Sequence, residues 1–446
     1  MNFKKVMISF AKTFFLCTPS PEGLSKIIKC FFSKKYEEKI LKFGYDTKIE
    51  KNLNYIEKNQ KKVKIKLKQK LERKEKLNVA FYVYDPSKWK CQSLYEQMEK
   101  DKRFEPFVFA TKCAASKENF NYQTEKDVEE TYEFFKKKNL KVKYAFDISK
   151  DKFIPFEKMK PKPDIIIYQH PWYIETSQGP VVCSKFALTF YVPYFIATTK
   201  MFFEYGLRFH QYITGHFVLN ESIKNEFSKK IPNKGKNLIS VGHPQIDEIL
   251  KDKTPNEEKY IIYAPHWSVT GKNIRLSTFD WSAKFIQDFA FKNKDLNWVF
   301  KPHPLLYNFL ISSNFMSKKE VDEYFNRWGE IGEVFLSGAY IPLFKKSSIL
   351  ITECGSFLTE YLFTKKPCVH LISKEGAEFN ESVQKISNSY YQAKNKEELE
   401  EILNSLIFKK NDYKKSERQA CLEELELGKE NSSSKIIEEI SKFLRN

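Results

Sequence analysis

One stretch of the chain reads Ser348-Ile-Leu-Ile-Thr-Glu-Cys-Gly-Ser-Phe-Leu-Thr-Glu-Tyr361, an apolar run that passes directly into a helical pattern. Ile349–Thr352 predicts a buried strand, and we expect a helix to start near Ser356, a good N-cap residue. Glu353 ends the strand, and Gly355 permits close approach to the backbone. The free N–H groups and the dipole of such a helix start favour a phosphate.

Glu360 follows Ser356 by one helical turn. A carboxylate at this position is suited to accept hydrogen bonds from ribose hydroxyls. The alternative from the residues alone is a plain capped helix whose Glu360 lies on a solvated face. Both interpretations stay open at this point.

Short apolar or β-branched runs occur on both sides of this stretch, and helical patterns such as Glu125–Asn139 and Phe279–Phe291 lie between them. The runs are Leu77–Tyr84, Pro106–Ala110, Val142–Ile148, Asp164–Gln169, Ala187–Val192, Tyr212–Leu219, Leu238–Val241, Tyr260–Tyr263, Trp298–Phe300, Val334–Leu336, Ile349–Thr352 and Val369–Ile372. Strands alternating with helices predict parallel sheets covered by helices.

A polar stretch, Asp247–Glu258, separates the two series of strands. We therefore expect two facing Rossmann-like α/β domains, over residues 77–247 and 248–446, with a helical tail on the second. Residues 1–76 form a basic, helical N-terminal extension in this interpretation. Ligands of such sheets bind beyond the carboxyl ends of the strands. A length of 446 residues with 41% hydrophobic content fits two domains.

The net charge of +19 is concentrated in the extension, because residues 1–76 carry 21 Lys/Arg and only 8 Asp/Glu. Such a segment attracts anionic lipid or nucleic acid, although compositional bias with solvated helices is the alternative. Apolar residues mixed with lysines predict a helix lying on a membrane surface, and the alternative is an ordinary helix packed on the next domain. These apolar residues are Phe14, Phe15, Ile27, Ile28, Phe31 and Phe32. No segment has the length of apolar sequence that a spanning helix needs.

The eight cysteines form no C-x-x-C pair. The sequence therefore favours reduced thiols over a zinc ribbon or a disulfide framework. No D-x-D pair lies near the helix start either. We expect no tightly bound cofactor and no metal requirement.

Four of the seven histidines stand next to a proline and directly follow a predicted strand: His170, His243, His266 and His303. Strand ends are where α/β enzymes place functional groups, and proline there fixes the turn. One such histidine alone is more often structural, but four at equivalent places favour a functional role.

Four ordered segments between residues 162 and 374 resemble one family. Gly242–Asp247 (GHPQID) is similar to a G-x-P-R-x-D turn, and Tyr263–Trp267 (YAPHW) to a Y-A-P-T-[FW] strand end. Lys301–Pro304 matches K-P-H-P, and Leu350–Pro367 resembles an L-I-T-D-Y-S-S…[DE]…K-P block. This order resembles the CDP-glycerol glycerophosphotransferase family, which includes the teichoic-acid glycerol phosphate polymerases and primases. The resemblance implies a GT-B-like fold.

The sequence departs from the family pattern at several positions. Glu353–Ser356 (ECGS) replaces D-Y-S-S, Gln245 replaces the arginine of the turn, and His266 stands where threonine is usual. The family's W-H-G element, which bears a catalytic histidine, corresponds to Gln169–Trp172 (QHPW) at an equivalent strand end. The donor is therefore CDP-glycerol, another nucleotide-linked polyol phosphate, or a nucleotide sugar.

The resemblance implies a cytoplasmic, membrane-peripheral transferase that moves glycerol phosphate from a CDP-linked donor to a polymer or lipid-linked acceptor of a capsule or teichoic acid. We expect His170 to act as general base, and His303 to contact the donor pyrophosphate. The expected substrate-binding residues are His243, His266, Lys301, Glu353, Gly355, Ser356 and Glu360.

Two alternatives compete with this interpretation. The first is a GT-B glycosyltransferase that uses a CMP- or UDP-sugar. The second, ranked low, is a nucleic-acid-binding protein, but the sequence has neither a zinc finger nor an RNP-type strand. The sequence leaves the oligomeric state and the choice between single addition and polymerisation open.

Overall fold

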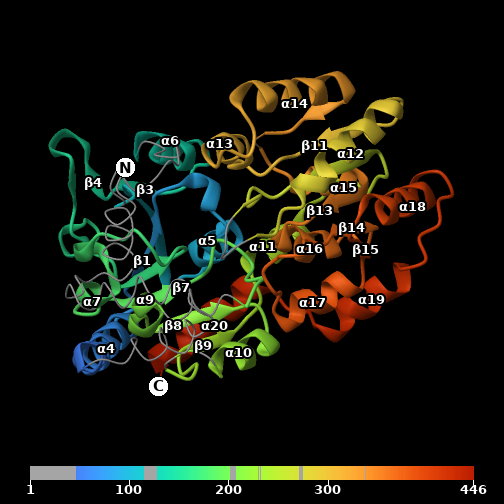
Figure 1. The fold of residues 1–446 in the computed structure, drawn as a ribbon. Helices are drawn as coiled ribbons and strands as arrows, with labels where there is room; N and C mark the ends of the chain where they lie inside the picture. The colour runs from blue at the N-terminus through green and yellow to red at the C-terminus, as the bar shows by residue number, and fades with distance from the viewer. Residues whose placement is uncertain are drawn as a thin grey trace. The chain divides into compact units, whose positions relative to one another are not determined.

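The computed structural model describes residues 47–114, 128–200, 207–229, 231, 233–270, 275–336 and 338–445 (Figure 1). The chain divides into two compact units. Unit 1 holds the described residues up to Phe195, those within Met201–Asp247, and the C-terminal segment from Glu430. Unit 2 holds Ile196–Lys200 and Glu248–Lys429. The predicted α/β class with two Rossmann-like units is confirmed.

The sheet of unit 1 has seven strands in the order β3-β2-β1-β6-β7-β8-β9, and every pairing in it is parallel. The strands are β1 Leu77–Val83, β2 Phe104–Ala110, β3 Val142–Tyr144, β6 Ile165–Tyr168, β7 Leu188–Tyr191, β8 Gly215–Val218 and β9 Leu238–Ser240. Each falls within or overlaps a run expected from the sequence. Two short strands, β4 Phe146–Asp147 and β5 Lys152–Phe153, pair antiparallel apart from this sheet.

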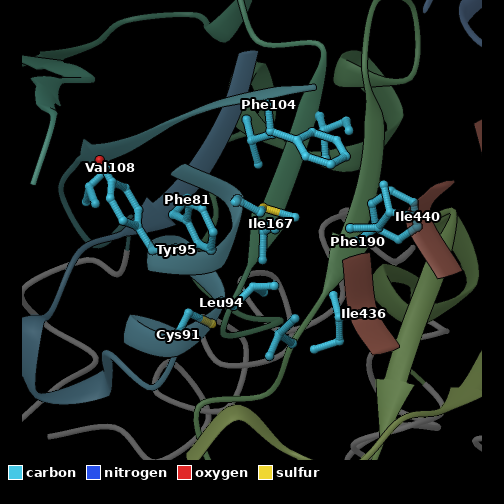
Figure 2. Close-up of a cluster of buried hydrophobic side chains, with 14 of the residues drawn as sticks. Phe81, Cys91, Leu94, Tyr95, Phe104, Val108, Ile167, Phe190, Ile436 and Ile440 are labelled. Atoms are coloured by element: carbon cyan, nitrogen blue, oxygen red, sulfur yellow. The ribbon is translucent and has the colours of Figure 1, made fainter. Parts of the chain in front are cut away.

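Alternate side chains of the central strands enter two different cores, because successive residues of a strand point to opposite faces. The helices of unit 1 are α4 Thr47–Glu72, α5 Gln92–Lys100, α6 Val128–Lys137, α7 Pro180–Cys183, α9 Arg208–Tyr212, α10 Glu221–Ser228 and α20 Ser432–Arg445, and α11 Pro244–Lys251 runs from unit 1 into unit 2 after Asp247. On one face, Phe81 and Ile167 pack with α5 and α20, and Figure 2 shows Ile440 of α20 beside Phe190. On the other face, Tyr82 and Tyr168 pack with α7 and α9.

The last helix, α20, belongs to unit 1, whereas we expected the second domain to run to residue 446. Asp247 explains this difference, because its carboxylate accepts the N–H groups of Ser432 and Ser433, each at 2.8 Å. Gly242, with φ of +88°, leaves room for the side chain of Ser432. The GHPQID turn thus holds the start of α20, whose apolar face completes the core of unit 1.

Within the basic extension, Thr47–Glu72 forms the helix α4. Its apolar side is buried in unit 1, where Val63 and Leu67 join the core. Lys70 forms an ion pair with Asp164 at 2.6 Å. The proposed anchor residues between Phe14 and Phe32 lie outside the described residues. Among the described helices, none combines the length and the apolar character needed to cross a membrane.

The sheet of unit 2 has six parallel strands in the order β12-β11-β10-β13-β14-β15. They are β10 Tyr260–Ala264, β11 Trp298–Phe300, β12 Glu333–Val334, β13 Ser347–Thr352, β14 Cys368–Leu371 and β15 Tyr391–Ala393. The helices are α12 Phe279–Lys292, α13 Leu306–Ser312, α14 Lys318–Ile331, α15 Ile341–Lys346, α16 Gly355–Leu362, α17 Glu381–Asn388, α18 Lys396–Ile407 and α19 Lys415–Glu424. The strand β15 was not expected from the sequence.

Candidate functional site

In each sheet the first three strands in the chain are added toward one edge, and the later strands are added toward the other edge. In unit 1 this switch point lies between β1 and β6, and in unit 2 it lies between β10 and β13. Ligands of open α/β sheets bind beyond the carboxyl ends of the strands at such points. His170 follows β6, His266 follows β10, and Glu353 follows β13. Each unit therefore carries motif residues at its own switch point, where the fold favours a site.

The switch point of unit 2 is closed by hydrogen bonds to Glu353, which is fully buried. Its Oε1 accepts the N–H of His266 at 3.2 Å, the hydroxyl of Ser277 at 3.0 Å and the N–H of Thr278 at 3.3 Å. The carboxylate thus joins the end of β13 to the end of β10 and to the loop that enters α12.

The second oxygen of Glu353, Oε2, is buried and has no hydrogen-bond partner among the described residues. Burial raises the pKa of Glu353 to about 7, and the hydrogen bonds from Ser277, His266 and Thr278 partly oppose that rise. Near neutral pH the carboxyl group is therefore close to half-protonated. A proton on Oε2 would reduce the cost of burying an unpaired carboxylate oxygen.

His266 and His303 lie side by side, with ring centroids 5.2 Å apart. The Nδ1 of His266 is 2.8 Å from the hydroxyl of Ser268. The Nδ1 of His303 accepts the backbone N–H of Leu305 at 3.1 Å, and the backbone N–H of His303 donates to the carbonyl of Pro265. Burial lowers the pKa of His266 to about 3 and that of His303 well below 6.5. Both rings are neutral at physiological pH, with Nδ1 used in positioning.

The helix α16 begins at Gly355 with Cys354 as its N-cap, one residue earlier than expected, so Ser356 is a first-turn residue and not the cap. The side chain of Cys354 makes no capping hydrogen bond by the usual distance criteria. The first-turn N–H groups of such a helix start are the donors through which the sequence predicts that an anion binds. Thr198 packs closely against Gly355, because a Cβ placed on Gly355 would lie 2.7 Å from the Cβ of Thr198.

Thr198 is a site residue that the sequence analysis missed. It belongs to Ile196–Lys200, a short segment assigned to unit 2 although it follows β7 in the chain. The carbonyl of Thr198 accepts the N–H of Asn380 at 2.9 Å, and the side-chain amide of Asn380 donates to the carbonyl of Ala197. No motif in the sequence marks this segment, because its place depends on contacts with residues about 180 positions away.

Lys301 and Glu360 are both buried within unit 2. The Nζ of Lys301 lies 4.8 Å, 5.1 Å and 5.7 Å from the ring centroids of Phe357, Tyr340 and Phe335. The carboxylate of Glu360 accepts the hydroxyl of Tyr340 at 2.5 Å. Glu360 therefore does not lie on a solvated face. Through these contacts both side chains stabilise the starts of α15 and α16. The contacts of Glu360 give no support to the predicted ribose binding.

In unit 1, His170 is 1% exposed, and neither of its ring nitrogens has a hydrogen-bond partner among the described residues. Its ring contacts Tyr84, which follows β1, with centroids 3.8 Å apart. Burial and the nearby charge of Lys88 lower the pKa of His170 well below 6.5. A neutral imidazole with unused nitrogens fits a proton acceptor.

His243 has a different environment from the other three strand-end histidines. Its Nε2 lies 2.8 Å from the carbonyl of Pro193, and its Nδ1 accepts the N–H of Gln245 at 3.2 Å. Both ring nitrogens are used by the backbone of unit 1, which gives this residue a structural position. Lys366, from the K-P block, is structural in the same sense, because its Nζ donates to three backbone carbonyls.

Among the described residues, no group of three His, Cys, Asp or Glu side chains gathers as metal ligands. The six described cysteines are free thiols. The sequence-based expectation about metals remains a prediction.

Two parallel Rossmann-like sheets, each with its motif residues at the switch point, define a GT-B-like fold. Comparison with solved structures supports this class. The chain is similar to S. aureus MnaA solved with UDP, with a TM-score of 0.56 and 14% identity over 83% of this chain and 97% of that chain. It is also similar to UDP-GlcNAc 2-epimerase from Neisseria meningitidis bound to UDP-GlcNAc, with a TM-score of 0.55 and 15% identity over 82% of this chain and 100% of that one.

A third similar structure is a variant of the wall teichoic acid polymerase TagF, with a TM-score of 0.52 and 12% identity over 87% of this chain and 98% of that chain. No family model and no curated protein sequence matches the chain. At these identities the structural likeness establishes the fold.

Proposed function

We propose that this protein transfers glycerol phosphate, or a related polyol phosphate, from a CDP-activated donor to a hydroxyl group of a cell-surface polymer. The acceptor oxygen forms a bond to the β-phosphorus, the bond from that phosphorus to the CMP oxygen breaks, and CMP leaves. The hydroxyl proton passes to a base. In phosphoryl transfer of this kind, positioning and charge stabilisation supply most of the rate enhancement.

The observation that carries this proposal is the composition of the unit 2 switch point. The neutral rings of His266 and His303 lie together beyond β10 and β11, and the start of α16 follows β13. Ring N–H groups and helix N–H groups are donors suited to a pyrophosphate. Similar folds hold UDP in one case and UDP-GlcNAc in another, and TagF is a teichoic acid polymerase.

We assign His303 to the leaving phosphate and His266 to the donor or acceptor head group. His170 of unit 1 is the proposed general base, because its pKa is depressed and its ring nitrogens are unused. Glu353 positions the backbone of His266 and does not contact the donor in this assignment. Removing a general base costs about 10²–10⁴-fold in rate.

A donor screen tests the assignment directly. We expect CDP-glycerol or CMP to raise the melting temperature of the full chain, by an amount that grows with ligand concentration. His303→Ala should weaken that shift, whereas His243→Gln should leave it in place because His243 is held by the backbone of unit 1. If no cytidine nucleotide stabilises the protein, the proposal is wrong.

A GT-B glycosyltransferase that uses a nucleotide sugar is the second candidate, favoured by the similarity to structures that hold UDP or UDP-GlcNAc. Mass analysis of the product separates the two. A phosphodiester link supports polyol phosphate transfer, and a glycosidic link supports the second candidate.

We also propose that the exposed lysines of α4 attract an anionic membrane surface, where a lipid-linked acceptor resides. Those exposed lysines are Lys51, Lys58, Lys61, Lys62, Lys66 and Lys68. Deleting the helix would also remove Leu67 from the core, so replacing three of these lysines by glutamine is the cleaner test. Reduced binding to phosphatidylglycerol vesicles, with unchanged melting temperature, is the expected result. Unchanged vesicle binding would reject this role for α4.

A further inference from the structure

The side chain of Glu353 reaches across the switch point of unit 2 from the end of β13. Its Oε1 accepts the backbone N–H groups of His266 and Thr278, at 3.2 Å and 3.3 Å, and the hydroxyl of Ser277 at 3.0 Å. Aspartate stands at this position in the family pattern that the sequence resembles. Glutamate is longer by one methylene group, which gives the carboxyl group this reach, so we treat the link as a feature of this chain.

A second link between the same two strand ends fixes the backbone from Glu353 to α16. The hydroxyl of Thr352 donates to the carbonyl of Ala264 at 2.7 Å and accepts the N–H of Cys354 at 3.0 Å. Cys354 is the N-cap of α16, so Glu353 stands two residues before the first helical residue, Gly355. Because consecutive Cα atoms are about 3.8 Å apart, these two backbone positions lie within about 8 Å of each other. A charge on Glu353 is near enough to influence an anion at the helix start, since buried charges are screened little by salt.

The second carboxyl oxygen of Glu353, Oε2, is buried without a hydrogen-bond partner among the described residues. A bare buried carboxylate oxygen is costly, and a proton removes much of that cost. Burial accordingly raises the pKa of Glu353 to about 7. Both protonation states of this carboxyl group are therefore accessible near neutral pH.

The titratable groups that face Glu353 keep their charge near neutral pH. Burial lowers the pKa of His266, after β10, to about 3. The pKa values of Tyr263 on β10 and Tyr324 on α14 are raised, mainly by burial and in part by the charge of Glu353. Burial also raises the pKa of the adjacent Cys354 thiol. The loop before α12 contributes a hydroxyl and a backbone N–H, which do not titrate in this range, so a proton exchanged in this group near pH 7 belongs to Glu353.

We propose that Glu353 is a proton-linked positioning residue, which takes up a proton when a nucleotide diphosphate donor binds at the start of α16. This inference rests on the proposed function, because it adds a regulatory property to the same donor site. The positive end of a helix favours negative charge, and a bound pyrophosphate both repels an ionised Glu353 and competes with it for that end. The proton comes from solvent and is held on Oε2, while Oε1 keeps its three hydrogen bonds. By linkage, the donor and the proton tighten each other's binding by the same factor.

Calorimetric titration of the full chain with CDP-glycerol at pH 6 and pH 8 tests this linkage. Each phosphate of CDP-glycerol has two substituents and keeps one constant charge in this range, whereas the terminal phosphate of CMP titrates near pH 6. If the bound donor tightens the proton on Glu353 about tenfold, donor affinity should fall about fivefold from pH 6 to pH 8. Titrations at pH 7.5 in two buffers with different enthalpies of ionisation should show an uptake of about half a proton per donor.

Glu353→Gln removes the titration but keeps the shape, because the amide oxygen can accept the same three hydrogen bonds. The affinity of this variant for CDP-glycerol should change less than about twofold between the two pH values. Glu401→Gln is the matched control, since it makes the same change of net charge at an exposed position of α18 in the same unit. The control should keep the fivefold fall. A fall of equal size in Glu353→Gln and in the wild type would overturn the inference.

A measurement on the wild type alone gives the answer even where Glu353→Gln does not fold. The chain has seven histidines, so labelling with 15N-histidine gives few backbone signals. The N–H of His266 donates to Glu353 and its 15N shift reports the protonation of that carboxyl group. We expect this shift to titrate near pH 7 and its midpoint to rise when CDP-glycerol is added. A midpoint that the donor leaves unchanged contradicts the proposal.

A parallel titration with UDP-GlcNAc, which carries the same kind of diphosphate, separates this inference from the proposed function. If CDP-glycerol binds equally well at both pH values, the proton linkage is wrong while the proposed function stands. If only UDP-GlcNAc binds, with the fall in affinity and the rise in the His266 midpoint, the linkage stands and the polyol phosphate donor fails. Binding of neither nucleotide at either pH would overturn the donor site and this inference with it.

Discussion

Glu353 accepts the backbone N–H of His266 at 3.2 Å and thereby ties the end of β13 to the end of β10. This bond spans the one place in unit 2 where strand order reverses. The link between these two strand ends therefore depends on the protonation state of one buried carboxyl group.

The Glu353→Gln substitution should change how stability depends on pH. The folded pKa of Glu353, at about 7, is raised above its ordinary value of 4.5, so the folded state binds the proton more tightly than the unfolded chain does. The stability it contributes is therefore fully present below pH 4.5 and is lost as pH rises through 7. The loss is at most about 1.4 kcal/mol per pH unit.

Denaturant unfolding of the wild type and of Glu353→Gln at pH 5 and pH 7.5 measures this effect. The wild type should lose more of its unfolding free energy between the two values than the variant does. Equal changes in both proteins would mean that Glu353 does not carry a shifted pKa. Glu438→Gln, an exposed change on α20, is a suitable control.

Asp247 should be one of the most sensitive positions in unit 1. Its two carboxylate oxygens accept N–H groups from Ser432 and Ser433 and the hydroxyl of Ser433, all at the buried start of α20. Asp247→Ala leaves those donors unsatisfied, so we expect a loss of about 2–4 kcal/mol in unfolding free energy. Cleavage near Glu430 by a nonspecific protease should also accelerate. Resistance equal to that of the wild type would show that α20 is held by its apolar face alone.

The sequence predicts the strands well where parallel strands are buried on both faces. Runs such as Ile349–Thr352 are almost wholly apolar there, as parallel sheets require. The order of the two series and the strand-end histidines then places His170, His266 and Glu353 at the switch points, and His303 beyond the neighbouring strand β11. Prediction succeeded because these features depend on local sequence.

What the sequence could not predict depends on contacts between distant residues. Asp247 and Ser432 are 185 positions apart, and only their hydrogen bond explains why α20 returns to unit 1. Thr198 likewise joins unit 2 by pairing with the segment that contains Asn380. The same reasoning applies to Lys301, whose K-P-H-P motif suggests a ligand contact while its ammonium group is enclosed by three aromatic rings. A motif fixes the position of a residue in the chain but not the direction of its side chain.

The buried His243 should make the protein sensitive to mild acid. Its Nε2–H donates to Pro193 and its Nδ1 accepts from Gln245, so only the neutral ring satisfies both bonds. Burial lowers its folded pKa to about 4, below the ordinary histidine value of 6.5. Stability is therefore present above pH 6.5 and is lost as pH falls toward 4, by about 1.4 kcal/mol per pH unit at most.

Comparing wild type with His243→Gln at pH 7 and pH 5 checks this prediction. Glutamine has a neutral amide that does not titrate, so the variant should lose less unfolding free energy on acidification, although it is less stable at pH 7. A variant that loses as much as the wild type would place the acid sensitivity in other buried histidines, such as His266.

The close approach of Thr198 to Gly355 should appear as energetic coupling between the two positions. In Gly355→Ala the added methyl group would lie 2.7 Å from the Cβ and 2.8 Å from the Oγ1 of Thr198, so the segment Ile196–Lys200 must shift. We expect this variant to lose about 1–3 kcal/mol, as overpacked cores do. Thr198→Gly removes all the clashing atoms, and the double variant should recover at least 1 kcal/mol relative to additive behaviour. CMP titration of the same four proteins then shows whether the position of this segment also matters for the start of α16. Additive stability effects, with donor affinity unchanged in all four, would mean that Gly355 and Thr198 do not pack against each other in solution.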